Sequence, residues 1–281
     1  MASTMHQGRQ GRASSIAVLV VAAAVLAATA FGLGSAVTGT LRDDEDRETT
    51  ADPSGITAAG DPATETATDS APDGVQTRAD ALAAEPMLEL PESAAYPQPV
   101  VTEKAGPPIR IPPPQVTIVV GGPPVPTGFP RTPEGALAQL AAIDQVAMST
   151  VDMTRVHEVY DWAALPGAIP EQEWVPWLAV GAFRQELGEA ELAVARLEFT
   201  VVQGQIKGTV GADLVLACVL GEASLTIVSV GQGAIGRCER MVWSGDRWWI
   251  GPGAAPADAP QAWPGSADAV RGGWRDLVVG D

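Results

Sequence analysis

Few residues in this sequence have the types and spacing that catalysis requires. His157 and Asp161 stand four residues apart, so on a helix they share one face, and a His–Asp pair can transfer protons. A solvated surface pair is the more common role of this spacing. The H-E-x-x-H, G-x-S-x-G and phosphate-binding G-x-x-x-x-G-K-[ST] motifs are absent from the sequence. We therefore expect no catalytic residue, no cofactor and no metal site.

The two cysteines, Cys218 and Cys238, are a candidate disulfide. Two cysteines without a nearby histidine pair are too few for a zinc site. If their strands form a hairpin that bends near Val228, the cysteines lie directly opposite and can bridge where the local geometry allows. An oxidising exterior permits a disulfide, whereas two small buried thiols are the alternative. The sequence leaves both open.

The tryptophans offer a candidate contact surface. Trp243 and Trp248 flank a Ser-Gly-Asp turn, so a cross-strand pair is predicted. Trp248 and Trp249 are adjacent on one strand and must face opposite sides of the sheet. An exposed tryptophan suits a protein interface, so both are candidate interface residues, although packing in the core is the more common role.

Regular elements that could position these side chains are predicted between residues 131 and 270. Thr132 and Pro133 form a typical helix start. Apolar spacing predicts three helices, within 131–150, over 153–165 and over 176–187. A period of two then predicts strands that begin near 197 and cover 214–220, 234–243 and 247–250. The expected fold is α+β, with three helices packed on a curved, cone-like antiparallel sheet of about four strands.

An N-terminal membrane anchor is predicted over residues 13–41. This stretch carries no charge, and its apolar part is long enough to span a bilayer. Arg9 and Arg12 precede it and acidic residues follow it, so residues 1–12 are expected in the cytoplasm and the C-terminal domain outside it. An uncleaved anchor is favoured over a cleaved signal peptide, and both place the bulk of the chain outside the cytoplasm.

The remaining segments are predicted to lack a core of their own. Residues 42–130 are first acidic and then rich in proline, which is typical of a disordered linker and an extended spacer. Residues 131–270 are the expected extracytoplasmic domain. Residues 271–281 are expected to form a C-terminal tail.

Three helices followed by a bent antiparallel sheet resemble the nuclear transport factor 2-like cone fold. The stretches GFPRTPEGALAQLAAID (128–144), QIKGTVGADLVLACVL (205–220) and CERMVWSGDRWWIGPG (238–253) look like a family of actinobacterial single-pass membrane proteins of integrative and conjugative elements. With its anchor and linker, the architecture is also similar to that of the membrane-anchored scaffold subunits of type IV secretion and conjugation machines.

This resemblance implies a non-enzymatic scaffold or accessory protein of a conjugation complex that acts through protein contacts of its outer domain. Protein partners are expected and direct nucleic-acid contact is not, because 34 acidic against 17 basic residues give a formal charge of −17. The sequence leaves open whether the chain forms a homo-oligomer.

Two alternatives share this plan. The cone fold often holds a pocket, so a small-molecule-binding or enzymatic domain is one alternative. A pocket lined by polar groups such as Tyr160, Asp161 or Arg184 would favour it. An accessory protein of an envelope lipid-transport system is the other.

Overall fold

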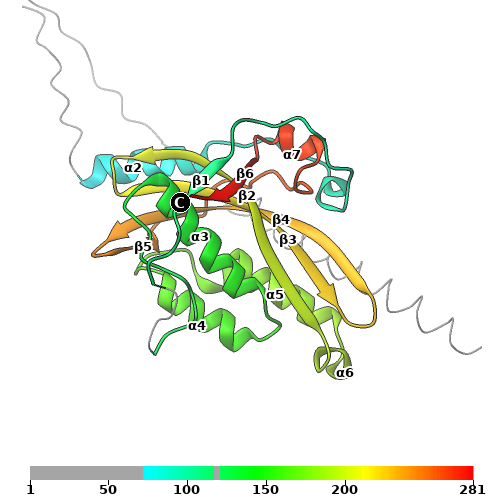
Figure 1. Cartoon of the computed structure of the whole chain (residues 1–281). Helices are drawn as coiled ribbons and strands as arrows, with labels where there is room; N and C mark the ends of the chain where they lie inside the picture. Colours follow the sequence, from blue (N-terminus) through cyan, green and yellow to red (C-terminus); the bar gives the residue numbers. More distant parts are fainter. Residues whose placement is uncertain (1–71, 117–120, 281) are drawn as a thin grey trace, which may run out of the picture.

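A curved six-stranded sheet organises the computed structural model, which describes residues 72–116 and 121–280. The strands are β1 (Ile109–Ile111), β2 (Arg196–Val210), β3 (Leu214–Thr226), β4 (Val230–Ser244), β5 (Arg247–Ile250) and β6 (Arg275–Val279). The α-helices are α2 (Pro72–Ala84), α3 (Pro133–Met148), α4 (Met153–Ala163), α5 (Val175–Glu186), α6 (Glu189–Leu192) and α7 (Ala267–Arg271). Two 3-10 helices are η1 (Glu92–Ala95) and η2 (Glu171–Glu173). The order in the sheet is β1-β6-β2-β3-β4-β5, with only the β1–β6 pair parallel (Figure 1).

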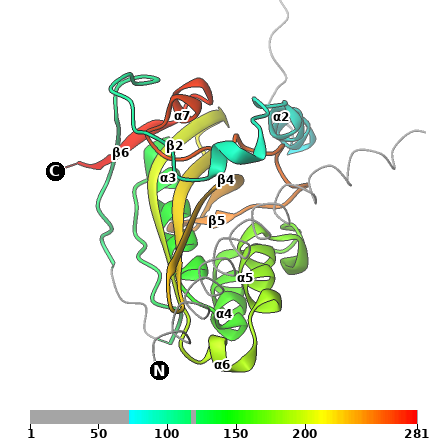
Figure 2. The ribbon, with the colours of Figure 1, turned by 90° about the vertical axis from the view of Figure 1, so that its right-hand side faces the viewer.

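The three long strands, β2, β3 and β4, bend side by side in Figure 2. Strand β2 has register shifts at residues 201–203 and 206–208. Each shift inserts an extra residue, which bends a strand and re-aims a side chain. Lys207, at the second shift, donates from Nζ to the carbonyls of Ala83 (3.0 Å) and Glu85, at the C-terminal end of α2. The second register shift thus places Lys207 where it hydrogen-bonds to the end of α2 and holds this helix against the sheet.

Helices α3, α4 and α5 cover one face of the sheet, below it in Figure 1. Thr132 caps α3, because its side-chain oxygen accepts from the backbone N–H of Gly135 at 3.1 Å. Leu137, Leu140 and Ile143 of α3 are fully buried in the main core with the side chains of β3 that point to this face. The predicted α+β order, three helices followed by long antiparallel strands, is confirmed.

The opposite face of the sheet is covered as well. Ala79 and Ala83 of α2 pack on Leu214 and Leu216. The segment 259–274 covers the neighbouring part of this face, where the buried residues include Cys218, Leu220, Cys238 and Trp274. Strand β3 carries apolar residues on both of its faces, so each face of the sheet needs a covering layer.

The predicted linker 42–130 and tail 271–281 differ from the structure wherever it describes them. Residues 72–116 and 121–130 lie on the domain, and residues 275–279 form β6, which pairs with both β1 and β2. Their low hydrophobicity is misleading, because alanines in this region are small enough to pack closely against the sheet. The sheet therefore has six strands rather than about four.

The predicted membrane anchor, residues 13–41, the cytoplasmic tail, residues 1–12, and the linker residues 42–71 lie outside the described residues. Within residues 72–116 and 121–280, no helix is long and apolar enough to cross a membrane.

Replacing Gly135 with alanine tests the contact between α3 and the preceding loop. A Cβ at this position would clash with the carbonyl oxygen of Pro130, which also accepts from the indole of Trp248. We expect Gly135→Ala to lower the free energy of unfolding by about 1–3 kcal/mol in urea denaturation, despite the better helix propensity of alanine.

Gly181→Ala is the matched control, because Gly181 also lies in a helix but, apart from the backbone of that helix and the two neighbouring residues, nothing stands within 4 Å of the place where a Cβ would lie. This change should stabilise the chain by about 0.5–1 kcal/mol. Equal effects of the two substitutions would contradict the packing of α3 described above.

Candidate functional site

A cavity of about 560 Å³ lies beside the outer edge of β4. Strand β5 pairs with β4 only from Met241 to Ser244, so in the described chain the preceding part of β4 has β3 on one side and no strand on the other. Residues 236–239 form one wall of the cavity. The loop 167–170, the start of α5 and the segment 253–261 form the others. Most wall residues are alanine, glycine or proline.

A buried ion cluster links this wall to the helices. Arg237 of β4 donates from Nε to Asp144 Oδ2 of α3 at 2.7 Å and from Nη2 to the other carboxylate oxygen. Its Nη1 donates to Glu239 Oε2 at 2.7 Å. Arg237 is 3% exposed, Glu239 1% and Asp144 0%. The guanidinium also lies 5.6 Å from the ring centroid of Trp174. Burial of this kind is rare for charges unless they are paired.

The ion cluster of Asp144, Arg237 and Glu239 holds two acids and one base. Burial raises the pKa of both Asp144 and Glu239, and the nearby guanidinium only partly offsets this effect. With both carboxylates ionised, the cluster carries one uncompensated negative charge in a region of low dielectric constant, which is costly. The cluster therefore favours a bound proton or a nearby cation.

More acidic groups stand around the same cavity. Glu173 and Asp258 line it and are exposed. Although Asp258 is exposed as a whole residue, its carboxyl is partly desolvated, and this desolvation and then the charge of Glu89 raise its pKa. Among the described residues that line the cavity, Arg237 is the only basic one. The cavity is thus negatively charged when its carboxylates are ionised.

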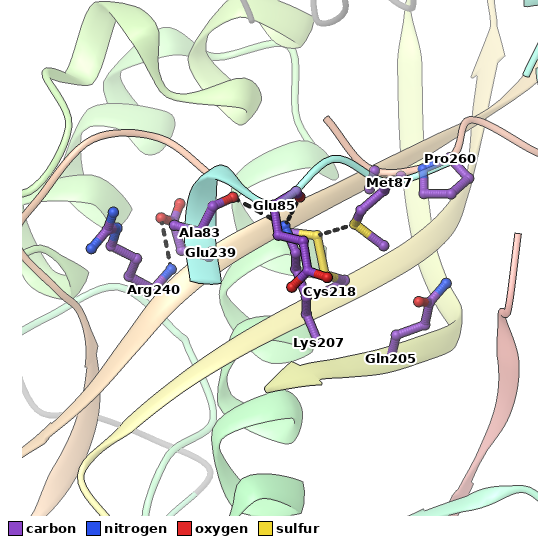
Figure 3. Close-up of a disulfide and its surroundings, with 12 residues drawn as sticks. Ala83, Glu85, Met87, Gln205, Lys207, Cys218, Glu239, Arg240 and Pro260 are labelled. Atoms are coloured by element: carbon purple, nitrogen blue, oxygen red, sulfur yellow. Dashed lines mark hydrogen bonds between the residues drawn. A yellow bond between two sulfur atoms is a disulfide. The ribbon is translucent and has the colours of Figure 1, made fainter. Parts of the chain in front are cut away.

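The disulfide lies behind this wall, on the face of the sheet that α2 covers (Figure 3). Cys218 and Cys238 pair directly across β3 and β4, as the hairpin predicts, and they are joined by a disulfide. Met87 covers it with Sδ 3.5 Å from Cys238 Sγ. Cys238 also lines the cavity. The disulfide thus fixes the edge of β4 that forms the cavity wall.

The two candidate interface tryptophans have different environments. Trp248 is 1% exposed, packs edge-to-face on Trp243 at 5.4 Å and donates from Nε1 to Pro130 O at 2.8 Å. The prediction of an interface role for Trp248 is therefore wrong, because the side chain is inside the core. Trp249, on the other side of β5, is half-buried.

Trp249 belongs to a stack with Arg247 and Trp162. The Arg247 guanidinium lies 3.5 Å from the centroid of Trp249 and 3.8 Å from that of Trp162, and it donates to Trp162 O at 2.7 Å. Burial lowers the pKa of Arg247 to about 10. All three residues keep part of their surface exposed.

The remaining candidates from the sequence do not meet at the cavity. His157 contacts Glu171 Oε1 at 2.9 Å and Asp161 Oδ2 at 3.4 Å on the surface, and hydrogen bonding to Glu171 raises its pKa. Tyr160 donates to the carbonyl of Ile169, and Arg184 to that of Val151. In the described ranges, no three His, Cys, Asp or Glu side chains are arranged to hold a metal ion.

Sequence reasoning missed the ion cluster, although a signal exists. Leu137, Ala141, Asp144 and Met148 recur on one helix face, so Asp144 is an acid on an otherwise apolar stripe. In β4, Arg237 and Glu239 alternate in phase with apolar Ile235 and Met241. An acid on the apolar face of a helix and a base on the apolar face of a strand together indicate a buried ion pair.

Comparisons of the chain with family models, with curated proteins and with solved structures find no match.

Glu239→Gln tests the electrostatics of the ion cluster. A carboxyl whose pKa is raised by folding stabilises the native state at low pH, and this stability is lost as pH rises from the unfolded value, 4.5, through the folded pKa. The native chain should therefore lose stability above about pH 4.5 relative to Glu239→Gln. Urea midpoints between about pH 4 and 8 measure this difference.

The exposed Glu198 provides the control, because Glu198→Gln removes the same charge outside the ion cluster. Its stability should follow the native pH profile. A Glu239→Gln profile parallel to the native one would show that Glu239 does not titrate abnormally.

Removing both cysteines tests the contribution of the disulfide. The bond closes a loop between residues 20 positions apart. Cys218→Ala with Cys238→Ala should lower the free energy of unfolding by about 3 kcal/mol, because the unfolded chain gains entropy. Urea denaturation of the native chain, oxidised and reduced, provides the comparison. Equal midpoints for the oxidised chain and the double variant would argue against a stabilising bond.

Proposed function

We propose that the chain is a non-enzymatic, membrane-anchored scaffold or accessory protein, whose cone-like outer domain contacts other proteins of a conjugation-type DNA-transfer complex. The observation that supports protein contact is the partly exposed stack of Trp162, Arg247 and Trp249. Tryptophan and arginine are enriched among the residues that dominate binding energy at protein interfaces.

The stack is held in place before any partner arrives. Arg247 is fixed by its hydrogen bond to Trp162 O, and Trp249 by a bond from Nε1 to Ser244 O at 3.0 Å. The neighbouring Ile250 O accepts from Leu165 N at 2.9 Å, which joins β5 to the end of α4. Side chains that are already ordered lose less entropy on binding, so the stack suits a specific contact.

The assignment to a transfer complex rests on the resemblance of the predicted anchor and the α+β domain to conjugation scaffold subunits. The predicted anchor would fix the domain at the outer surface of the membrane. The formal charge of −17 favours protein partners over the transferred DNA itself.

Trp249→Ala tests the role of the stack. In cells that carry the transfer system, a tagged full-length chain should recover transfer components, and the variant should recover fewer of them. Truncating a residue that dominates an interface costs about 2 kcal/mol or more, equivalent to roughly 30-fold weaker binding. Transfer frequency should fall in parallel.

Val228→Ser is the control, because Val228 is 67% exposed at the turn between β3 and β4 and takes no part in the stack. Its recovery and transfer frequency should match those of the native chain. Recovery of the native chain without any transfer component, or unchanged transfer after deletion of the gene, would refute the proposed function.

A further inference from the structure

We propose that the cavity beside β4 binds a cationic side chain attached to an amide, as in a basic amino-acid amide or a basic residue of a peptide. The volume of about 560 Å³ falls within the range of small-ligand pockets. This binding role is separate from the protein contacts proposed for the stack of Trp162, Arg247 and Trp249.

The charges around the cavity select a cation. Glu173, Glu239 and Asp258 line it, whereas Arg237 is already paired with Asp144 and Glu239. A cationic ligand would offset the negative charge that the ion cluster leaves uncompensated. The geometry favours an organic cation over a metal ion, since the carboxylates in the described residues do not converge into a metal site.

Unpaired donors on a buried side chain provide an independent indication of a ligand. A guanidinium has five N–H groups, and those of Arg237 make three hydrogen bonds, to Asp144 and Glu239. The other two N–H groups have no acceptor among the residues that the structure describes. Because Arg237 is 3% exposed and lines the cavity, a carbonyl oxygen on the ligand is a suitable acceptor.

The edge of β4 offers a partner for an amide. The backbone N–H and C=O of Gly236 bond to the side-chain amide of Gln261, at 2.9 and 2.6 Å, and Gly251 N donates to Arg240 O at 2.7 Å. Outward-facing backbone groups recur at every second residue, so those of Cys238 also face outward, at the cavity wall. They present one donor and one acceptor to an amide, as a sheet edge does to an added strand.

Calorimetric titration of the purified full-length chain tests this site. N-acetylarginine amide should give saturable binding. N-acetylcitrulline amide has nearly the same shape but a neutral urea in place of the guanidinium, and it should bind at least about tenfold more weakly because the ion–ion attraction is lost. Tighter binding of an acetylated alanyl-arginyl-alanine amide than of the single amino-acid amide would identify a peptide as the source of the cation, and the reverse would identify a free small molecule.

Paired variants separate this site from the overall negative charge of the chain. Glu173→Gln with Asp258→Asn changes two exposed residues at the cavity and should weaken binding of N-acetylarginine amide about tenfold. Glu186→Gln with Glu198→Gln removes the same charge from exposed positions outside the cavity wall and should leave binding unchanged. Near-ultraviolet circular dichroism checks that all four substitutions leave the fold intact.

Three results would overturn the proposal. They are the absence of saturable heat with both arginine probes, equal binding of the citrulline probe, and equal weakening by the two double variants. Equal binding of the citrulline probe would show that binding depends on shape alone. Equal weakening by the two double variants would show that it depends on diffuse attraction to an acidic protein.

Discussion

The buried pairing of Arg237 with Asp144 and Glu239 constrains the rest of the structure. A guanidinium inside a core is costly unless carboxylates surround it, so α3 and β4 must meet where Asp144 reaches Arg237. Because neighbouring residues of a strand face opposite sides, this placement directs Cys238 to the other face, where it meets Cys218. The contact between Arg237 and Asp144 thus agrees with the position of α3, with the register of β4 and with the disulfide.

The same packing of β4 determines which of its groups face the cavity. Strand β5 is short, and its pairing with β4 covers only Met241 to Ser244. Further back along β4, the side chain of Gln261 bonds to the backbone of Gly236. Between these two points the strand presents charged side chains and backbone groups to a cavity walled by small residues. The disulfide behind it ties this edge covalently to β3.

The sequence was most informative where the pattern is local and repetitive. Thr132 and Pro133 mark the start of α3, and the turn at Ser244 to Asp246 places Trp243 opposite Trp248, as predicted. Local periodicity extends over a few residues and reports which face of an element is apolar. It correctly places Trp248 and Trp249 on opposite faces of the strand, but it does not show which of the two is buried.

Long-range contacts explain what could not be predicted. Ala79 and Ala83 are too small to indicate a core in the sequence, yet they pack closely because Leu214 and Leu216 lie beneath them. The parallel pairing of β1 with β6 joins two short segments far apart in the chain, for which no local pattern exists. The cavity likewise combines β4 with two loops, and only the three-dimensional arrangement brings Glu173 and Asp258 to it.

The position of β6 has a consequence for the order of assembly. This strand lies between β1 and β2, so β1 joins the sheet only through β6, which follows it by more than 160 residues in the sequence. During synthesis, β1 leaves the ribosome long before its neighbour exists. The helices and the hairpins of β2 to β5 can form first from contacts between nearby residues, whereas we expect β1, which closes the longest loop of the sheet, to pair last. Completion of the sheet therefore reports that the whole described chain has been made.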